Sequence, residues 1–166
     1  MRTLGIESIR SGDVLHCISN GLLGKLIQKF TKSRINHTAL VIEVWGELFI
    51  IDSQKDGTNP RPLQEWVMKY DYKYKIHRPL NFSNRTKYRA VSKWGHTPYD
   101  FASLFIWQPI YILTGKWHGR KEPRADGRMY CSEYVSWVFE LPNWWRLSPQ
   151  AAFDTMIKSG KFELIE

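Results

Sequence analysis

Cys131 is the residue of this sequence whose type and position most clearly indicate chemistry. It stands at the start of a segment, residues 129–139, in which Val135, Val138 and Phe139 recur at helical spacing. The first turn of a helix carries unpaired backbone N–H groups and the positive end of the helix dipole, which favour a thiolate over a thiol. Cys131 is therefore a candidate nucleophile. The alternative is a buried structural cysteine, because free cysteine is among the most buried residue types.

A cysteine nucleophile needs a base, and His37 is the best placed of the five histidines. His37 begins an apolar strand that runs to Val44. A polar ring at the end of a buried strand lies at the edge of the core, where sites are built. The alternative is a strand-end histidine that is hydrogen-bonded to a loop.

The strand that follows His37 predicts the residue that orients the base. If Trp45-Gly46 is a two-residue hairpin turn, His37 lies opposite Gln54, and Asp52 is its diagonal neighbour on the same face. A carboxylate there would fix the imidazole tautomer and stabilise the imidazolium. Gln54 is the reserve candidate, because an amide can also orient the ring. A three-residue turn would move Asp52 to the opposite face.

The sequence does not predict a metal site. No pair of histidines or cysteines has the spacing of a zinc motif, and the adjacent His16 and Cys17 alternate across a strand. We expect neither a metal nor a cofactor.

The elements that must position these residues are a mixture of helices and antiparallel strands. Strands are predicted within 12–18 and at 37–44, 47–52, 73–78 and 161–165. Helices are predicted at 22–30, 86–94, 99–113 with a bend near Pro109, from Cys131, and from Pro149 after the cap Ser148. No βαβ repeat is present, so the fold class is α+β, with an antiparallel sheet or half-barrel packed against helices.

The composition predicts one globular domain over residues 1–166, with 43% hydrophobic residues. Two cysteines make no disulfide framework and fit a reducing compartment. The N-terminus lacks the apolar core of a signal peptide, and the longest apolar stretch, 101–113, is broken by Gln108-Pro109. We expect a soluble cytoplasmic protein, unless a separate route exports it.

The net charge of +8 favours anionic partners. Lys25, Lys29 and Lys32 share one face of the predicted helix 22–30, and apolar residues form its other face. This helix is a candidate for contact with an anionic or membrane surface, and a solvated helix face is the alternative. No nucleic-acid-binding module is recognisable, so no specific nucleic-acid partner is expected.

The candidate residues, in this order, resemble the circularly permuted branch of the NlpC-type papain-like cysteine hydrolases, the YiiX-like group. In ordinary members of that superfamily the cysteine helix precedes the histidine strand. Here the histidine comes first, as in the permuted branch and in lecithin:retinol acyltransferase-like enzymes. The segments that carry the resemblance are 11–15, 31–42, 49–52, 98–100, 130–133 and 148–149.

The resemblance implies a permuted papain-like fold with Cys131 as nucleophile, His37 as base and the acidic residue of the next strand as orienter. That acid is often Glu in relatives, whereas here it is Asp52, which is one methylene shorter.

Three further residues belong to the matched segments. Tyr99 and Tyr130 are candidates to line the site, although an aromatic residue before a helix is more often a packing contact. Asp100 is expected to cap or brace its helix.

The predicted function is that of a cysteine hydrolase cleaving an amide bond, in a peptide or N-acyl substrate such as a cell-wall peptide, through a thioester on Cys131. The Cys131 backbone N–H and a second, unidentified donor would hold the oxyanion. One alternative is a lipid acyl hydrolase or acyltransferase that uses the same two residues. The cationic helix and the apolar stretch 101–113 favour it. The other alternative is a non-catalytic polyanion-binding module in which tryptophans stack on the ligand.

Overall fold

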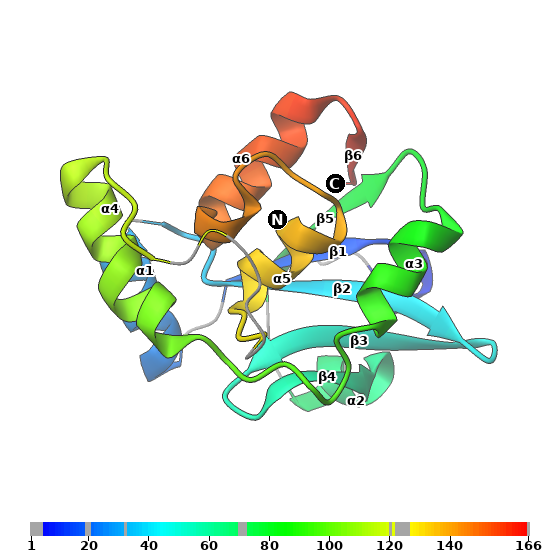
Figure 1. Ribbon diagram of the computed structural model, residues 1–166. Helices are drawn as coiled ribbons and strands as arrows, with labels where there is room; N and C mark the ends of the chain where they lie inside the picture. The colour runs from blue at the N-terminus through cyan, green and yellow to red at the C-terminus, as the bar shows by residue number, and fades with distance from the viewer. Residues whose placement is uncertain are drawn as a thin grey trace.

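A computed structural model describes residues 5–18, 21–31, 33–69, 73–119, 121 and 127–165. Within these residues six strands form one antiparallel sheet in the order β4-β3-β2-β1-β5-β6 (Figure 1). The strands are β1 (Val14–Ile18), β2 (His37–Val44), β3 (Glu47–Gln54), β4 (Gly57–Pro62), β5 (Lys73–Pro79) and β6 (Phe162–Ile165).

Helices cover both faces of this sheet, and α1 and α4 pack against each other at one end of the molecule (Figure 1). The α-helices are α1 (Leu22–Thr31), α2 (Leu63–Lys69), α3 (Asn84–Val91), α4 (Gln108–Thr114), α5 (Cys131–Val138) and α6 (Pro149–Ser159). Shorter helical segments are η1 (Ile6–Ser8), the π-helical η2 (Ser103–Trp107) and η3 (Trp144–Arg146).

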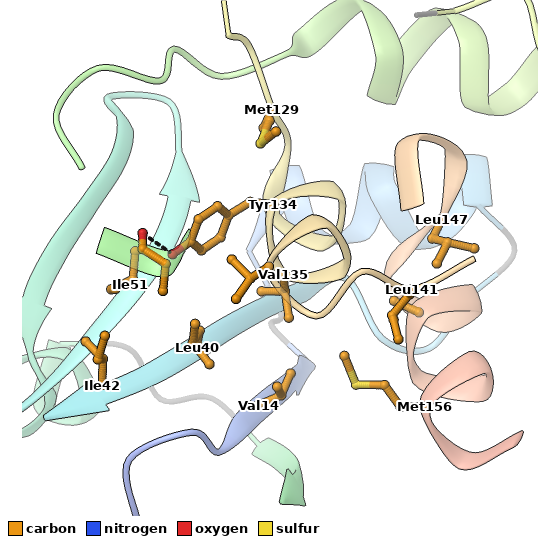
Figure 2. Close-up of a cluster of buried hydrophobic side chains, with 13 residues drawn as sticks. Val14, Leu40, Ile42, Ile51, Met129, Tyr134, Val135, Leu141, Leu147 and Met156 are labelled. Carbon is orange, nitrogen blue, oxygen red and sulfur yellow. Dashed lines mark hydrogen bonds between the residues drawn. The ribbon is translucent and has the colours of Figure 1, made fainter. Parts of the chain in front are cut away.

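Alternate side chains of the strands enter two separate cores. On one face, sheet residues pack beneath α5, where Tyr134 and Val135 are fully buried and the Tyr134 hydroxyl donates to the carbonyl of Ala90 at 3.0 Å (Figure 2). On the other face, residues of the opposite parity pack against Leu63 and Trp66 of α2. The sheet is therefore the middle layer, and the expected α+β class is confirmed.

The predicted hairpin is present with the predicted turn. Trp45 and Gly46 both have positive φ, 53° and 81°, as a two-residue type I′ turn requires. The β2–β3 ladder runs from Val44 opposite Glu47 to Leu40 opposite Ile51. This register places His37 and Asp52 on one face of the sheet.

Strand β4 and helix α2 were not predicted from the sequence. Pro60 and Pro62 interrupt the apolar pattern of β4 and cannot donate to a ladder, so they are tolerated because β4 is an edge strand. Gly57 begins β4 with φ +95°, and a Cβ there would lie 2.8 Å from the Thr97 carbonyl oxygen. The close approach of the chain at Thr97 therefore needs glycine at this turn.

The predicted helix 99–113 is wrong at its start. Asp100 caps the helix, because its carboxylate accepts from the Ser103 N–H at 2.9 Å and from the Ser103 hydroxyl at 2.7 Å. Tyr99 therefore lies in the loop before the helix. The π-helical segment η2 ends two residues before Pro109, the residue near which the sequence predicts a bend.

Two other boundaries differ from the predicted ones. Helix α3 occupies Asn84–Val91 in place of 86–94, because the Ser83 side chain caps it by accepting from the Thr86 N–H. Helix α6 does begin at Pro149 after the cap Ser148, as predicted, and β6 closes the sheet at Phe162–Ile165. In the part of the chain that the structure describes, no helix combines the length and apolar character needed to cross a membrane.

Candidate functional site

Cys131 is the first residue of α5, as predicted, and its side chain is fully buried. The backbone before it is held in place because the Tyr130 N–H donates to the Glu133 carboxylate at 3.3 Å. The next residue is also fixed, since the Ser132 hydroxyl donates to the Leu147 carbonyl at 2.8 Å. The thiol therefore sits at the positive end of a well-anchored helix.

His37 is the first residue of β2 and links the sulfur to the acid. Its Nε2 lies 3.0 Å from Asp52 Oδ2, and its ring is hydrogen-bonded to Cys131. Because Nε2 is used by Asp52, Nδ1 is the ring nitrogen left for the sulfur. The His37 side chain is 13% exposed, whereas the other two side chains are fully buried, so the site opens to solvent at the imidazole. The predicted contact between His37 and Asp52 is confirmed.

Asp52 is surrounded by donors from four elements. Besides His37 of β2, its Oδ2 accepts from Gln54 Nε2 at 2.6 Å and from Trp66 Nε1 at 3.1 Å. Its Oδ1 accepts from Arg61 Nη1. The second terminal nitrogen of Arg61, Nη2, donates to both carboxylate oxygens of the exposed Asp56 at 2.8 Å. Gln54, the reserve orienter, is thus bound to the acid.

The pKa values of the two groups move apart in the directions that an ion pair requires. Burial favours neutral Asp52, but the hydrogen bond and charge of His37, the charge of Arg61 and the Gln54 amide outweigh it and lower the pKa of the carboxyl. Burial would also lower the pKa of His37. Negative charge on Cys131 and hydrogen bonds to Asp52 and Cys131 raise that pKa to about 10. His37 therefore holds its proton at neutral pH when the sulfur is a thiolate.

Tyr99 lies beside the sulfur, and its hydroxyl is hydrogen-bonded to Cys131. Burial, followed by negative charge on Cys131, raises the pKa of Tyr99 well above its usual value. The phenol is therefore a hydrogen-bond donor at every physiological pH.

The backbone of Met129 holds the sides of the site together. Its carbonyl accepts from the Ser53 hydroxyl of β3 at 2.7 Å and from the Asp100 N–H at 3.4 Å. Its N–H donates to the Pro98 carbonyl at 3.0 Å. Because Ser53 follows Asp52, Tyr99 lies between Pro98 and Asp100, and Cys131 is two residues after Met129, these bonds set the three groups relative to one another.

Tyr130 was predicted to line the site, but its hydroxyl bonds residues outside the site. The hydroxyl accepts from Gln108 Nε2 at 3.0 Å and donates to the Leu147 carbonyl at 3.2 Å, which ties α5 to the loops around it. The bonds of its hydroxyl are structural, as the packing alternative predicted.

Arg61 and Trp66 are site residues that the sequence did not predict. Arg61 lies in β4, which was missed because the run Asn59-Pro60-Arg61-Pro62 does not have a strand pattern, and Trp66 lies in the short helix α2 that follows it. The two residues between Gln54 and Gly57 form a second tight turn, and this short spacing could have predicted that a further strand follows β3.

A polar cavity of about 310 Å³ adjoins Tyr99. It lies between the β3–β4 turn and the loop 95–99, and its lining residues include Lys55, Asp56, Asn59 and His96. Arg61 connects this cavity to the buried carboxylate, because it bonds both Asp56 and Asp52.

No protein-family model matches the sequence, and no curated protein matches it either. Among solved structures, the crystal structure of the metalloprotein yiiX from Escherichia coli O157:H7 is similar to this chain, with a TM-score of 0.65 and 21% sequence identity. The similarity covers 95% of this chain and 96% of that chain. The chain therefore has a YiiX-like fold, and at this identity the similarity shows the fold alone.

We predict that a small neutral reagent such as iodoacetamide alkylates Cys131 at least about ten times faster than Cys17 at neutral pH. Both thiols are buried, so their electrostatics decide the difference. Burial, together with negative charge on Asp52 and Cys131, raises the pKa of Cys17 well above its usual value. Peptide mapping by mass spectrometry measures both rates. Replacing His37 with Ala should bring the rate at Cys131 down toward that at Cys17, and equal rates in the unmodified protein would contradict the assignment.

If Cys131 and His37 act as nucleophile and base, Asp52→Asn should lower turnover by about 10- to 100-fold, less than the loss of His37, which should cost at least about 10⁴-fold. The substitution removes a negative charge and a hydrogen-bond acceptor that raise the pKa of His37. The alkaline limb of the parent protein's pH profile should lie near pH 10, where the imidazolium of His37 loses its proton, and in Asp52→Asn this limb should move to lower pH.

The matched control for that pH profile is Asp56→Asn, which removes the exposed carboxylate on Arg61 and leaves the bond between Asp52 and His37. Its alkaline limb should match the parent. An unshifted limb in Asp52→Asn, or the same shift in both variants, would rule out Asp52 as the group that holds the proton on His37.

Proposed function

We propose that this protein is a cysteine hydrolase that cleaves an amide bond through a thioester on Cys131. The observation that carries the proposal is the continuous hydrogen-bonded chain from Cys131 through His37 to the buried Asp52, with the sulfur at the first residue of a helix. A nucleophile, a base and an orienting acid in this order are the groups that acyl transfer requires.

In the first step the Cys131 sulfur, paired with the imidazolium of His37, attacks the carbonyl carbon of the amide. The C–S bond forms, and the carbonyl oxygen takes up the negative charge. When the C–N bond breaks, His37 gives its proton to the leaving amine, and the acyl group remains on Cys131 as a thioester. Asp52 stabilises the charged ring before this transfer and holds its tautomer afterwards.

In the second step neutral His37 removes a proton from water, which attacks the thioester and releases the acid and the thiolate. We assign the oxyanion to two donors, the Cys131 backbone N–H and the Tyr99 hydroxyl. The bond of that hydroxyl to Cys131 and the raised pKa of the phenol support its role as the second donor.

We further propose that the fold is the circularly permuted papain-like arrangement. The histidine strand β2 precedes the cysteine helix α5 in the chain, which is the order of the permuted branch. The YiiX-like fold is consistent with this proposal. A permuted relative with its cysteine, histidine and acid in the same arrangement would support the proposed chemistry as well as the fold.

A polar substrate fits the surroundings of the sulfur. The cavity beside Tyr99 offers a lysine, a carboxylate, an amide and a histidine, so it can bind the charged and hydrogen-bonding groups of a peptide. Thr58, at the edge of this cavity, is buried, and its hydroxyl has no hydrogen-bond partner among the described residues. These features favour a peptide or N-acyl amide.

A lipid acyl hydrolase or acyltransferase is the second candidate, because large apolar side chains near the site are exposed. Phe101 is 46% exposed, and its ring lies 4.7 Å from that of Tyr99. An acyl chain could follow this surface to the same sulfur. A polyanion-binding module is the weaker alternative, because it gives no reason for an acid and a histidine to be aligned on a buried thiol.

The yiiX protein is described as a metalloprotein, which raises the question of a metal site in this chain. In the described ranges no group of three or more His, Cys, Asp and Glu side chains is arranged so that it could hold a metal ion. The lone pairs of Asp52 and the Nε2 of His37 are taken by the hydrogen bonds within the site. The residues do not fit a metal ion, and the proposed mechanism has no step that uses one.

We predict that Cys131→Ala and His37→Ala each lower hydrolysis by at least about 10⁴-fold, because nucleophile and base act as one unit. The assay compares peptide amides, N-acyl amides and phospholipid esters, so it also decides between the two enzyme candidates. The controls are Cys17→Ala and His118→Ala, which replace the other thiol and an exposed histidine that does not line the cavity, and both should keep parental turnover. Full turnover by either Cys131→Ala or His37→Ala would refute the proposal.

We predict that Tyr99→Phe lowers turnover by about 10²-fold with little change in KM, because an oxyanion donor acts in the transition state. The matched control is Tyr130→Phe, which removes a buried hydroxyl that bonds Gln108 and Leu147. That change should cost about 1 kcal/mol of stability and spare turnover. If both variants, or neither, lose turnover, Tyr99 is not the donor.

A further inference from the structure

Helix α1 presents large apolar side chains to solvent. Leu22, Leu26 and Phe30 are 82%, 42% and 41% exposed. They follow one another at four-residue spacing, so they form a continuous stripe on the helix. The buried side of the same helix is formed by other residues, among them Ile27 and Thr31. The stripe is therefore not part of the core that holds α1 in place.

Two lysines stand directly beside this apolar stripe. Lys25 and Lys29 are exposed, and each lies three residues after a leucine of the stripe, which makes them neighbours on the helix surface. The sequence had predicted the lysines on the face opposite the apolar residues. The structure corrects this, because cationic and apolar side chains share the solvent side. Lys32, the third lysine of the predicted set, lies outside the described residues.

A row of aromatic rings joins the stripe to the candidate site. The ring of Phe30 lies 6.3 Å from that of Phe105, which stacks on Phe101 at 6.4 Å, and Phe101 lies 4.7 Å from Tyr99. Tyr99 in turn contacts Cys131. Apolar surface thus runs from α1 across the start of the helical segment 101–114 to the edge of the site.

We propose that this surface, the α1 stripe with its two lysines and the neighbouring Phe101, docks on a membrane that contains anionic lipid. An apolar stripe flanked by lysines on a short helix is the arrangement that lies in the interface of a bilayer, with leucine and phenylalanine inserted and the ammonium groups at the headgroups. At ten residues α1 is about 15 Å long, too short to span the membrane.

Charge complementarity selects the membrane over a second copy of the chain. A symmetric pair formed through this stripe would bring Lys25 and Lys29 of both copies together, in a protein whose net charge is already +8. An anionic bilayer neutralises the same lysines. The docking inference goes beyond the proposed hydrolase activity and does not depend on it. If both hold, the scissile bond is carried by an amphiphile at the bilayer surface.

The test is co-sedimentation of the full chain with vesicles of equal parts phosphatidylglycerol and phosphatidylcholine, compared with phosphatidylcholine alone. We expect binding to the anionic vesicles that weakens as salt is raised. Lys25→Gln/Lys29→Gln should weaken binding by about 5-fold per lysine, and Leu22→Gln/Leu26→Gln by at least roughly 10-fold.

The matched controls make the same types of substitution at surface positions away from α1. Lys158→Gln/Lys161→Gln and Met68→Gln/Ile157→Gln replace exposed lysines and exposed apolar residues away from α1 and should bind like the parent. Cys131→Ser should also bind like the parent, so a failure of the hydrolase proposal and a failure of docking are distinguishable. Circular dichroism verifies that each variant is folded.

Three results would overturn docking. The first is the absence of binding to anionic vesicles. The second is binding that the α1 variants weaken no more than the control variants do. The third is a dimer of the parent in solution, dissociated by Leu22→Gln/Leu26→Gln, without vesicle binding, which would assign the stripe to a second copy.

Discussion

The buried carboxylate of Asp52 is the constraint on which the candidate site depends. An ionised group without exposure costs several kcal/mol unless hydrogen bonds and opposite charge compensate it. The compensation comes from His37, Gln54, Arg61 and Trp66, which lie on β2, β3, β4 and α2. The Asp52 carboxylate thus needs three features of the fold at once. These are the register of the central hairpin, the proline-containing edge strand β4 and the packing of α2 on the sheet. The same compensation keeps the acid ionised and lets it hold a proton on the histidine.

The second requirement is to bring a helix from late in the chain to that histidine. Residues of α5 bury their apolar side chains on the face of the sheet opposite α2, which fixes the helix but leaves its first residue at the sheet's end. The backbone of Met129 completes the alignment, because it is bonded to Ser53 next to the acid and to Pro98 and Asp100 on either side of Tyr99. The thiol, the phenol and the acid therefore share one junction. This explains how Cys131, Tyr99 and Asp52, which are 32 to 79 positions apart in the chain, are brought together.

The sequence predicted the parts of the site that local rules determine. Strand alternation and the turn at Trp45-Gly46 placed His37 and Asp52 on one face, and helical periodicity placed Cys131 at the start of its helix. Arg61 and Trp66 were missed, because prolines conceal β4 and because packing, not spacing, brings their side chains to the acid. The exposure of the apolar stripe on α1 could not be predicted either, because helical periodicity identifies an apolar face but does not show whether the rest of the protein covers it. Catalytic roles remain predictions, since they depend on a substrate that neither pattern nor fold identifies.

The acylation of Cys131 that we propose is measured most directly as the mass of the intact protein in a reaction quenched with acid during turnover of an amide substrate. We predict an added mass equal to the acyl part of the substrate, located on Cys131 by peptide mapping and absent in Cys131→Ala. The His37→Ala variant should accumulate little of this species, because its sulfur lacks the base. Turnover of the amide with no acyl-enzyme on Cys131, and with the Cys131→Ala variant equally active, would rule out Cys131 as the nucleophile.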